Sequence, residues 1–245
     1  MTAENNEVLV KTEKVTKTYR TGEIETHALQ DITTEVTAGE FLAIVGPSGS
    51  GKTTLLNLIG ALDAVTSGNL EVMGRDVVAM TGRQRAELRL RSLGFVFQAY
   101  NLFPVLSAQE NVEFVLELQG IGKERCSTAR AALEELGLLD FADRRPTQLS
   151  GGQQQRVAVA RAIAAKPKLV LADEPTANLD GENARILLDM MRELNEKEGI
   201  TFVFSTHDPR VVAYARRVIT LVDGKIAKDV IKESEDNAEA PAEYE

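Results

Sequence analysis

Short apolar runs, bounded by turn residues, recur along the chain. The clearest occupy residues 41–45, 169–172 and 200–204, and each is four or five residues long and rich in Val, Ile, Leu or Phe. Runs this short and this uniformly apolar predict strands that are buried on both faces, as in a parallel sheet. A helical pattern separates the last two runs, and Gly199 follows it as a stop signal. The apolar positions of that helix include Ile186, Leu187, Met190 and Leu194.

The middle of the chain, residues 94–165, follows a mostly helical pattern. Ser107 and Glu110 have the spacing of a capping box ahead of one apolar stripe. A second stripe consists of Ala129, Ala132, Leu133 and Leu136, with Gly137 at its end. We therefore predict that residues 94–165 form a helical subdomain, inserted into a core that consists of residues 1–93 and 166–230.

Both ends of this predicted domain, residues 1–230, favour antiparallel strands. Residues 8–19 are rich in Val, Thr and Tyr, which are common in strands. Apolar residues flank Asp223-Gly224, a pair that fits a type I′ turn, so residues 218–230 predict a hairpin. The expected fold class is α/β, with a mostly parallel sheet, helices on both its faces, an antiparallel β subdomain and the helical insertion.

Composition narrows the class of protein. Hydrophobic content of 43% and charged content of 27% are near globular averages, and 245 residues can bury a large core. The net charge of −9 argues against a nucleic-acid binder that works by bulk charge. Cys126 is the sole cysteine, which excludes an intrachain disulfide, and we expect a buried or bystander thiol. Residues 231–245 carry six acids against one lysine, which predicts a disordered tail.

A glycine-rich segment follows the first apolar strand and matches the pattern G-x-x-x-x-G-K-[ST]. The strand before it and the helical run at 54–62 after it are the flanks that a phosphate-binding loop requires, and they argue against a chance glycine-rich turn. Backbone N–H groups of such a loop point at phosphate oxygens, and the helix adds its positive dipole end. We expect Lys52 to contact the β- and γ-phosphates and Thr53 to ligate Mg²⁺. The loop, which defines a P-loop NTPase core, consists of Gly46, Pro47, Ser48, Gly49, Ser50, Gly51, Lys52, Thr53 and Thr54.

Polar residues follow three of the apolar runs. Asp173-Glu174 ends one run, and adjacent side chains of a strand diverge, so we assign Asp173 to Mg²⁺ and Glu174 to the attacking water. The alternative is a solvated acidic turn before Pro175. His207 follows another run, at the sheet edge where ligands of parallel sheets bind, and we expect a clamp near the γ-phosphate. Gln98 ends a third run, and its amide is a candidate Mg²⁺ ligand.

A second glycine motif, residues 149–153, opens a predicted helix over 154–165. Ser150 and Gln153 have capping-box spacing, so one interpretation is a well-capped helix. The other is an anion site, because helix N-termini present bare N–H groups and a positive dipole end. A second anion site so far from the first along the chain suggests a composite site built from two chains. Its members are Ser150, Gly151, Gly152 and Gln153.

The order of these motifs over residues 8–230 resembles the nucleotide-binding subunit of ATP-binding-cassette (ABC) transporters. The most specific element is the 149–153 motif. The resemblance implies a head-to-tail dimer, in which each ATP lies between Lys52 of one chain and Ser150 of the other. It also implies that Tyr19 stacks on adenine and that Glu174 is the catalytic base. It assigns Asn178, Leu179 and Asp180 to the loop that links the two ATP sites.

Finer resemblance is to the lipoprotein-releasing and macrolide-export (LolD/MacB-like) group, through residues 94–98, 101–104, 109–112 and 150–157. Ala177 departs from the glycine that is commoner there. The group implies a separate membrane permease with a large extracytoplasmic domain, and an ATPase held at the cytoplasmic face. The sequence has no apolar run near the ~20 residues that span a bilayer and no visible signal peptide, so any spanning would fall to a partner.

Three functions share these motifs. The first is an ATPase subunit that drives export, lipoprotein release or mechanical signalling through a permease. The second is an ATPase that regulates a membrane complex of cell-wall remodelling without transport. The third, a soluble ABC protein on ribosomes or DNA, is disfavoured by the single cassette and the negative charge, so we expect no nucleic-acid partner. Residues 100–106 are apolar, and they either receive a permease helix or pack inside the helical subdomain.

Overall fold

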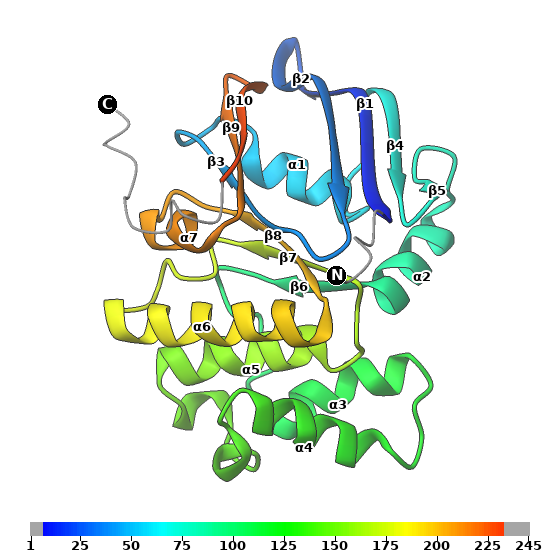
Figure 1. The fold of residues 1–245 in the computed structure, drawn as a ribbon. Coiled ribbons are helices and arrows are strands. Elements are labelled where there is room, and N and C mark those ends of the chain that lie inside the picture. Colours follow the sequence, from blue (N-terminus) through cyan, green and yellow to red (C-terminus); the bar gives the residue numbers. More distant parts are fainter. Residues whose placement is uncertain (1–6, 233–245) are drawn as a thin grey trace.

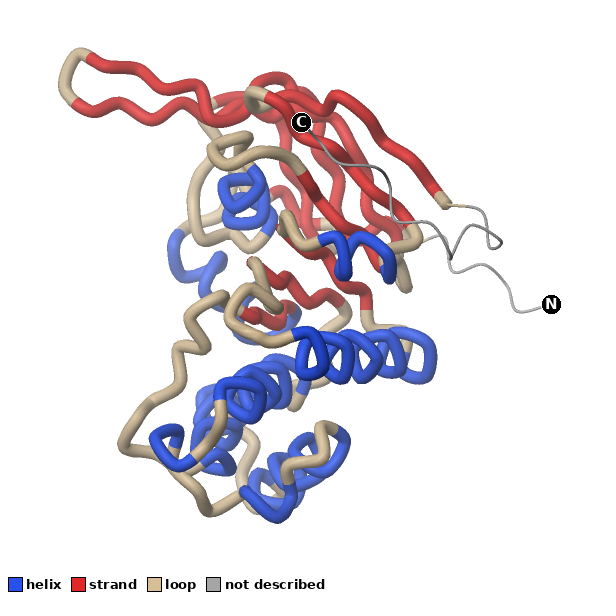
Figure 2. Tube along the Cα trace, turned by 90° about the vertical axis from the view of Figure 1, so that its left-hand side faces the viewer, coloured by secondary structure: helices blue, strands red, loops and turns tan. Residues whose placement is uncertain are grey.

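The computed structural model describes residues 7–232 and has a mixed α/β fold with two sheets and a helical region (Figure 1). In Figure 2 the two sheets occupy one half of the molecule and most of the helices the other. In that part of the chain, no helix combines the length and the apolar character that crossing a bilayer requires. The predicted acidic tail lies outside the described residues, except for its first two: Ile231 ends the last strand, and the N–H of Lys232 donates to the Arg216 carbonyl at 2.8 Å.

The first sheet is antiparallel and has the strand order β2-β1-β4-β5. Its two long strands come from the amino-terminal region that the sequence predicted to be antiparallel, and that prediction is confirmed. Buried and more exposed side chains alternate along much of β1, with interruptions where its register to β2 shifts, as expected of a sheet with one face in the core. The strands are β1 (Val8–Thr21), β2 (Ile24–Thr37), β4 (Ser67–Val72) and β5 (Arg75–Asp76).

The second sheet, called the core sheet below, has the strand order β10-β9-β3-β8-β7-β6. All its neighbouring pairs are parallel except the β9–β10 hairpin. All five residues of β3 and of β8 are buried, as the uniformly apolar runs predicted. The strands are β3 (Phe41–Val45), β6 (Leu93–Val96), β7 (Leu169–Asp173), β8 (Thr201–Ser205), β9 (Arg217–Val222) and β10 (Lys225–Ile231).

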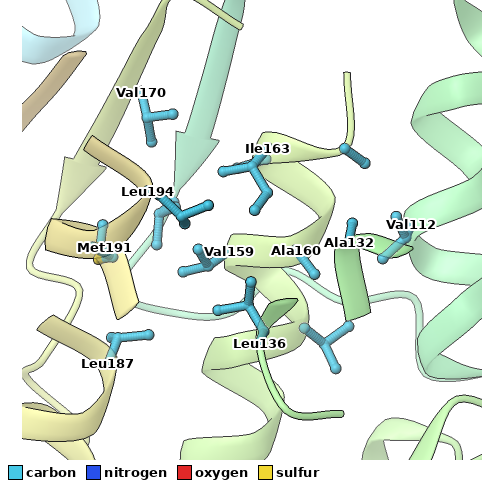
Figure 3. Packing of buried hydrophobic residues seen from close by; sticks show 14 of the residues in the cluster. Val112, Ala132, Leu136, Val159, Ala160, Ile163, Val170, Leu187, Met191 and Leu194 are labelled. Carbon is cyan, nitrogen blue, oxygen red and sulfur yellow. The ribbon is translucent and has the colours of Figure 1, made fainter. Parts of the chain in front are cut away.

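Alternation along the core sheet divides its side chains between two hydrophobic clusters. Leu42 and Ile44 belong to a cluster shared with helix α1 (Lys52–Ile59) and the antiparallel sheet. Phe41, Val170 and Phe202 belong to a cluster shared with the helices of the opposite face. Figure 3 shows this second cluster, where α5 (Gly151–Ile163) packs between α6 (Gly181–Glu198) on one side and α3 (Ala108–Leu118) and α4 (Arg125–Glu135) on the other. The prediction of a sheet covered on both faces is therefore confirmed.

The helical region contains three principal helices, α3 (Ala108–Leu118), α4 (Arg125–Glu135) and α5. The capping box of Ser107 and Glu110 at the start of α3 is confirmed. The remaining short helical elements of the described chain are α2 (Gly82–Ser92), η1 (Leu139–Phe141), η2 (Pro146–Gln148) and α7 (Pro209–Tyr214).

One boundary of the helical region differs from our expectation. Residues 94–96, which we predicted inside the insertion, lie in β6, an edge strand of the core sheet that pairs with β7. Gly94 allows α5 to approach this strand closely, because a Cβ there would lie 2.6 Å from the Ala162 carbonyl oxygen. A run of four residues has too little periodicity to reveal such a pairing, which depends on a strand more than seventy residues away.

The carboxyl-terminal hairpin matches its prediction in detail. Asp223 and Gly224 connect β9 and β10, and both have positive φ, at 47° and 74°. A type I′ turn requires positive φ at both central residues, so the turn type is confirmed.

The stop signal at Gly199 is also confirmed, because this residue caps α6 with a φ of 70° in the left-handed region.

Candidate active site

Three neighbouring strands of the core sheet carry most of the predicted site residues. The phosphate loop follows β3, Asp173 and Glu174 follow the run of β7, and His207 follows β8. These strands are parallel and adjacent in the order β3-β8-β7, so their carboxyl ends meet at one edge of the sheet. Thr53 and Asp173, which are 120 residues apart in the sequence, therefore lie together and are joined by a hydrogen bond.

The phosphate loop is curled around the ammonium group of its own lysine. Lys52 Nζ donates to the carbonyl oxygens of Gly46 and Pro47, at 2.7 and 3.0 Å. Gly51 caps α1 in the left-handed region, with a φ of 101° and no side-chain hydrogen bond to the helix end. Gly51 has no side chain with which to cap the first N–H groups of α1, so these groups are suited to bind an anion.

A cavity of about 600 Å³ lies beside this loop, a size suited to a small-molecule ligand. Gln98, Glu174 and His207, which were predicted from three separate motifs, line it together with the phosphate loop. The remaining lining residues come from β2, outside every motif that we had singled out. The full lining is Thr26, His27, Ala28, Gly46, Pro47, Ser48, Gly49, Gly51, Lys52, Thr53, Thr54, Gln98, Glu174 and His207.

Thr53 and Asp173 form the pair that we assigned to Mg²⁺. Thr53 Oγ1 donates to Asp173 Oδ1 at 3.0 Å, so two oxygen donors of the kind that Mg²⁺ prefers are adjacent. In residues 7–232, no group of three or more His, Cys, Asp or Glu side chains could hold a metal ion. The pair therefore fits Mg²⁺ only if phosphate oxygens or waters complete the octahedron, which is its usual mode at nucleotide sites.

The Glu174 carboxylate has a protein partner on each oxygen. His207 Nδ1 lies 2.7 Å from Oε1, and Thr206 Oγ1 donates to Oε2 at 3.1 Å. The Glu174 side chain is 14% exposed, whereas that of His207 is 74% exposed. Glu174 also has a φ of 47°, a left-handed backbone conformation that is uncommon outside glycine and concentrates at functional sites.

The second glycine motif lies outside the cavity that Lys52 lines. Ser150 caps α5 with its side chain, and Gln153 returns the hydrogen bond, so the predicted capping box is confirmed. The two glycines allow close packing: a Cβ on Gly151 would lie 3.0 Å from the Tyr100 hydroxyl, and one on Gly152 would lie 2.6 Å from Asn183 Oδ1.

Tyr19 and Asp180 also lie outside the cavity lining. Tyr19 is 40% exposed, and its hydroxyl donates to Asp63 Oδ2 at 2.8 Å. Burial and this hydrogen bond raise the pKa of the Tyr19 phenol. Asp180 caps α6, and the hydrogen bond from the Asn183 N–H lowers the pKa of the Asp180 carboxyl. The loop that contains it contacts the site through Asn178, which donates to the Gln98 carbonyl oxygen at 2.9 Å.

Sequence reasoning misses two residues of this region. His27 has no motif around it and would pass for an ordinary polar residue, yet it lines the cavity, and its ring pairs with the Thr18 hydroxyl at 3.0 Å. Thr206 has no predicted role, although it contacts Glu174. No local signal marks either one, because the first depends on the register of the β1–β2 pair and the second on the contact between β7 and β8.

The apolar segment 100–106 is partly exposed and partly packed inside the helical region. Phe103 and Val105 are 43% and 71% exposed, whereas Leu102 packs against the helical core.

Cys126 is exposed, and its Sγ lies 3.2 Å from the Gln109 amide nitrogen. The expectation of a buried thiol is therefore wrong, and the alternative of a bystander thiol is the one that is left.

Known proteins resemble this chain over nearly its whole length. The model of the family described as "ABC transporter" matches residues 29–177. The macrolide export ATP-binding/permease protein MacB of Syntrophobacter fumaroxidans is 48% identical over 224 residues, which are 89% of this chain. The lipoprotein-releasing system ATP-binding protein LolD of Anaeromyxobacter dehalogenans is 47% identical over 217 residues, covering 88% of this chain and 91% of that protein. This chain spans only 31% of the length of the MacB relative.

A solved structure is also similar to this chain, in fold as well as in sequence. The ATP-binding cassette MJ0796 of Methanocaldococcus jannaschii, solved as a dimer in a post-hydrolysis state with ADP and Pi, superposes with a TM-score of 0.85. The identity is 41%, and the match covers 91% of this chain and 98% of that one.

Proposed function

Because the chain belongs to the ABC transporter family of ATP-binding proteins, we propose that it hydrolyses ATP at a two-chain site and thereby drives a separate membrane permease. The observation that carries the proposal is the division of the motifs. Gln98, Glu174 and His207 line one cavity with the phosphate loop, whereas Ser150 lies outside it. The cavity of one chain therefore lacks the second glycine motif. A second copy of the chain is needed to bring its Ser150 to the nucleotide.

Binding begins with an exchange of partners at the phosphate loop. Lys52 leaves the carbonyl oxygens of Gly46 and Pro47 for the β- and γ-phosphates, whose negative charge the carbonyls lack. The N–H groups at the start of α1 then donate to phosphate oxygens. Thr53 and Asp173, with Gln98 at the cavity wall, would hold Mg²⁺, which neutralises the charge that develops on the phosphates.

Hydrolysis requires a base and a clamp close to the γ-phosphate. Glu174 is the proposed base, since its carboxylate lines the cavity and is largely withdrawn from solvent. His207 is the proposed clamp, because it is exposed enough to turn from Glu174 toward a phosphate. Tyr19 stacks on adenine in this proposal. Its hydroxyl either keeps its hydrogen bond to Asp63 or gives it up when the nucleotide binds.

The second chain supplies the other face of each ATP. In this arrangement Ser150 and the N-terminus of α5 contact the γ-phosphate bound by the partner, and Asp180 links the two sites. The dimeric state of MJ0796 with ADP and Pi supports a two-chain site in the family. The exposure of Ser150 supports it here, because this residue lies outside the cavity that the phosphate loop of its own chain lines.

The names of the relatives suggest the membrane partner. MacB is an ATP-binding/permease protein, and LolD is the ATP-binding protein of a lipoprotein-releasing system. We place this chain in that group, at the cytoplasmic face, held by a permease with a large extracytoplasmic domain. Its work would then be export, lipoprotein release or the passage of mechanical motion across the membrane.

An exposed apolar surface on the helical region supports the permease contact. Phe103 and Phe114 meet edge to face, with ring centroids 4.9 Å apart, and both are partly exposed. Val105 and Leu118 add exposures of 71% and 57%. Exposed apolar groups close together are typical of a protein interface, and we assign the surface around the Phe103–Phe114 pair to a helix of the permease.

The test of the proposal replaces Glu174 with Gln. Loss of the base should lower ATP turnover about a hundredfold or more while ATP affinity is kept. A Glu134→Gln variant, on the exposed face of α4, is the matched control and should turn over like the wild type. Tagged Glu174→Gln protein, extracted from native membranes with ATP and Mg²⁺, should retain a membrane protein. Turnover at the wild-type rate would exclude Glu174 as the base, and recovery of ribosomal proteins would exclude the permease assignment.

A further inference from the structure

The two oxygens of the Glu174 carboxylate are held very differently. Thr206 Oγ1 donates to Oε2, and Thr206 is completely buried. His207 Nδ1 contacts Oε1, and three quarters of the His207 side chain is exposed. One oxygen therefore faces the protein interior and the other faces a residue at the cavity wall that has room to move.

Thr206 is fixed by backbone contacts on both sides. Its N–H donates to the Ile44 carbonyl oxygen of β3 at 3.0 Å, which ties it to the strand before the phosphate loop. Its Oγ1 accepts the N–H of Asp208 at 2.9 Å. With a donor already on this oxygen, the hydroxyl hydrogen is free to point at Oε2 of Glu174, the acceptor within reach.

The residue beyond His207 is anchored as well. Asp208 accepts from Arg210 through both carboxylate oxygens and from the Thr176 hydroxyl at 2.6 Å. Burial opposes the charge of Asp208, but the hydrogen bonds from Arg210 and Thr176 outweigh it, and the pKa of this carboxyl is lowered. Asp208 therefore stays ionised and holds the loop, so Thr206 has a rigid frame while His207 projects from it.

The backbone of Glu174 is held to the same strand end. Its N–H donates to the Ser205 carbonyl oxygen at 2.8 Å, while its φ stays at 47°. A left-handed glutamate persists only where its surroundings determine its conformation, and here the end of β8 contacts both its backbone and its side chain.

We propose that Thr206 is a positioning residue that fixes Oε2 of Glu174, so that Oε1 is the oxygen that receives the proton of the attacking water. The inference rests on the proposed role of Glu174 as base. His207 vacates Oε1 when it turns to the γ-phosphate. The water O–H bond then breaks and its proton goes to Oε1, while the water oxygen bonds to the γ-phosphorus. The bond from that phosphorus to the bridging oxygen breaks, and ADP and phosphate result.

Two variants of Thr206 test the proposal. Thr206→Val keeps the shape and removes the hydroxyl, and it should lower kcat about ten- to a hundredfold, as expected for a lost hydrogen bond to a charged group. Because ATP binding uses other residues, the ATP dissociation constant should stay within about twofold. Thr206→Ser restores the hydroxyl and should recover most of kcat.

Ser205→Ala is the matched control. Ser205 is equally buried and adjacent, but its hydroxyl has no hydrogen-bond partner within residues 7–232, so its removal should leave kcat unchanged. Equal losses in Ser205→Ala and Thr206→Val would mean that packing at this strand end matters and not the hydroxyl, and would overturn the proposal. The proposal also fails if Thr206→Ser is folded and binds ATP but does not recover kcat.

A double variant separates this inference from the proposal on which it rests. If Thr206 acts through Glu174, then Thr206→Val should add no further loss of turnover to Glu174→Gln. An additive loss would show that Thr206 acts elsewhere. If instead Glu174→Gln alone turns over normally, the assignment of the base fails, and that outcome is distinct from a failure of Thr206.

Discussion

Two helices of this protein begin after glycine-rich motifs, and they use their glycines for different purposes. At the start of α1, the glycines permit a backbone that other residues cannot adopt: Gly46 and Gly51 have φ of 147° and 101°. At the start of α5, Gly151 and Gly152 have ordinary helical backbone, and their small size permits close contacts with neighbouring side chains. The first motif needs glycine for its backbone conformation (backbone shape), and the second needs it because neighbouring groups lie close to the backbone (backbone proximity).

The two helix ends also differ in how they satisfy their N–H groups. The start of α1 has no side-chain cap, whereas Ser150 and Gln153 form a complete capping box on α5. The uncapped end lines a cavity, and the capping residue Ser150 of the other helix is exposed. An uncapped end is prepared for a ligand within its own chain. A capped end is stable alone and offers a hydroxyl to whatever docks on it.

The sharpest test of this contrast places a methyl group in each motif. In Gly46→Ala the new Cβ would lie 2.1 Å from the Leu221 carbonyl oxygen, on a backbone that alanine does not favour. We expect a loss of about 3 kcal/mol or more in the free energy of unfolding, together with loss of ATP binding. Urea denaturation and calorimetric titration with ATP measure both.

Gly151→Ala is the counterpart in the second motif. Its Cβ would meet the hydroxyl end of Tyr100, which can move, and alanine favours the helix, so stability should change by less than about 1 kcal/mol. ATP affinity of the monomer should be kept while turnover falls. If Gly151→Ala unfolds the protein as Gly46→Ala does, the contrast between backbone shape and backbone proximity is wrong.

A mixing experiment tests the assignment of the two motifs to different chains. Lys52→Ala and Ser150→Ala should each be nearly inactive alone. Mixed in equal amounts, they should recover about a quarter of wild-type turnover, because half of the dimers are mixed and each has one intact site. The steady-state release of phosphate measures the recovery.

Failure of the mixture would be informative only with a control. Native mass spectrometry with ATP should first show that mixed dimers form. If they form and remain inactive, then Lys52 and Ser150 either act within one chain or require both sites to be intact, and the head-to-tail arrangement loses its support.

The smallest effect concerns pH and compares two capped helices. A hydrogen bond from the Asn183 backbone lowers the pKa of Asp180, the cap of α6, from its ordinary value. The stabilisation is therefore present above that ordinary value and is lost as pH falls through the lowered pKa. The Ser150 cap of α5 does not titrate.

Exchanging the two cap types should exchange this behaviour. Asp180→Ser should flatten the decline of stability with falling pH, and Ser150→Asp should add a new decline. Urea denaturation between about pH 3 and 5 measures the slopes. Identical slopes in the wild type and Asp180→Ser would mean that the cap contributes nothing through its charge.

Local features of this fold could be predicted from the sequence. The capping boxes at Ser107 and Ser150, the left-handed Gly199 and the turn at Asp223 each depend on residues within a few positions. The phosphate loop belongs with them, because its strand, loop and helix are contiguous. For these features, the residues that determine the conformation lie in the same short segment that adopts it.

The features that escaped prediction depend on pairing between distant strands. Residues 94–96 join the core sheet only through β7, and His27 reaches the cavity only through the register of β1 and β2. Thr206 contacts Glu174 because β7 and β8 end together. The roles of Lys52, Asp173 and Glu174 were predicted from their motifs and from the strand ends that they follow, whereas those of Tyr19 and Asp180 came from the family resemblance.

The central position of β3 has a consequence for the synthesis of the protein. This strand precedes the phosphate loop, yet it pairs with β8 and β9, which lie more than 150 residues later in the chain. Even the space beside Gly46 is bounded by the Leu221 carbonyl. Contacts this distant in sequence form late in folding. A ribosome must therefore release the chain through β9 before β3 has both its neighbours and the phosphate loop has the wall beside Gly46.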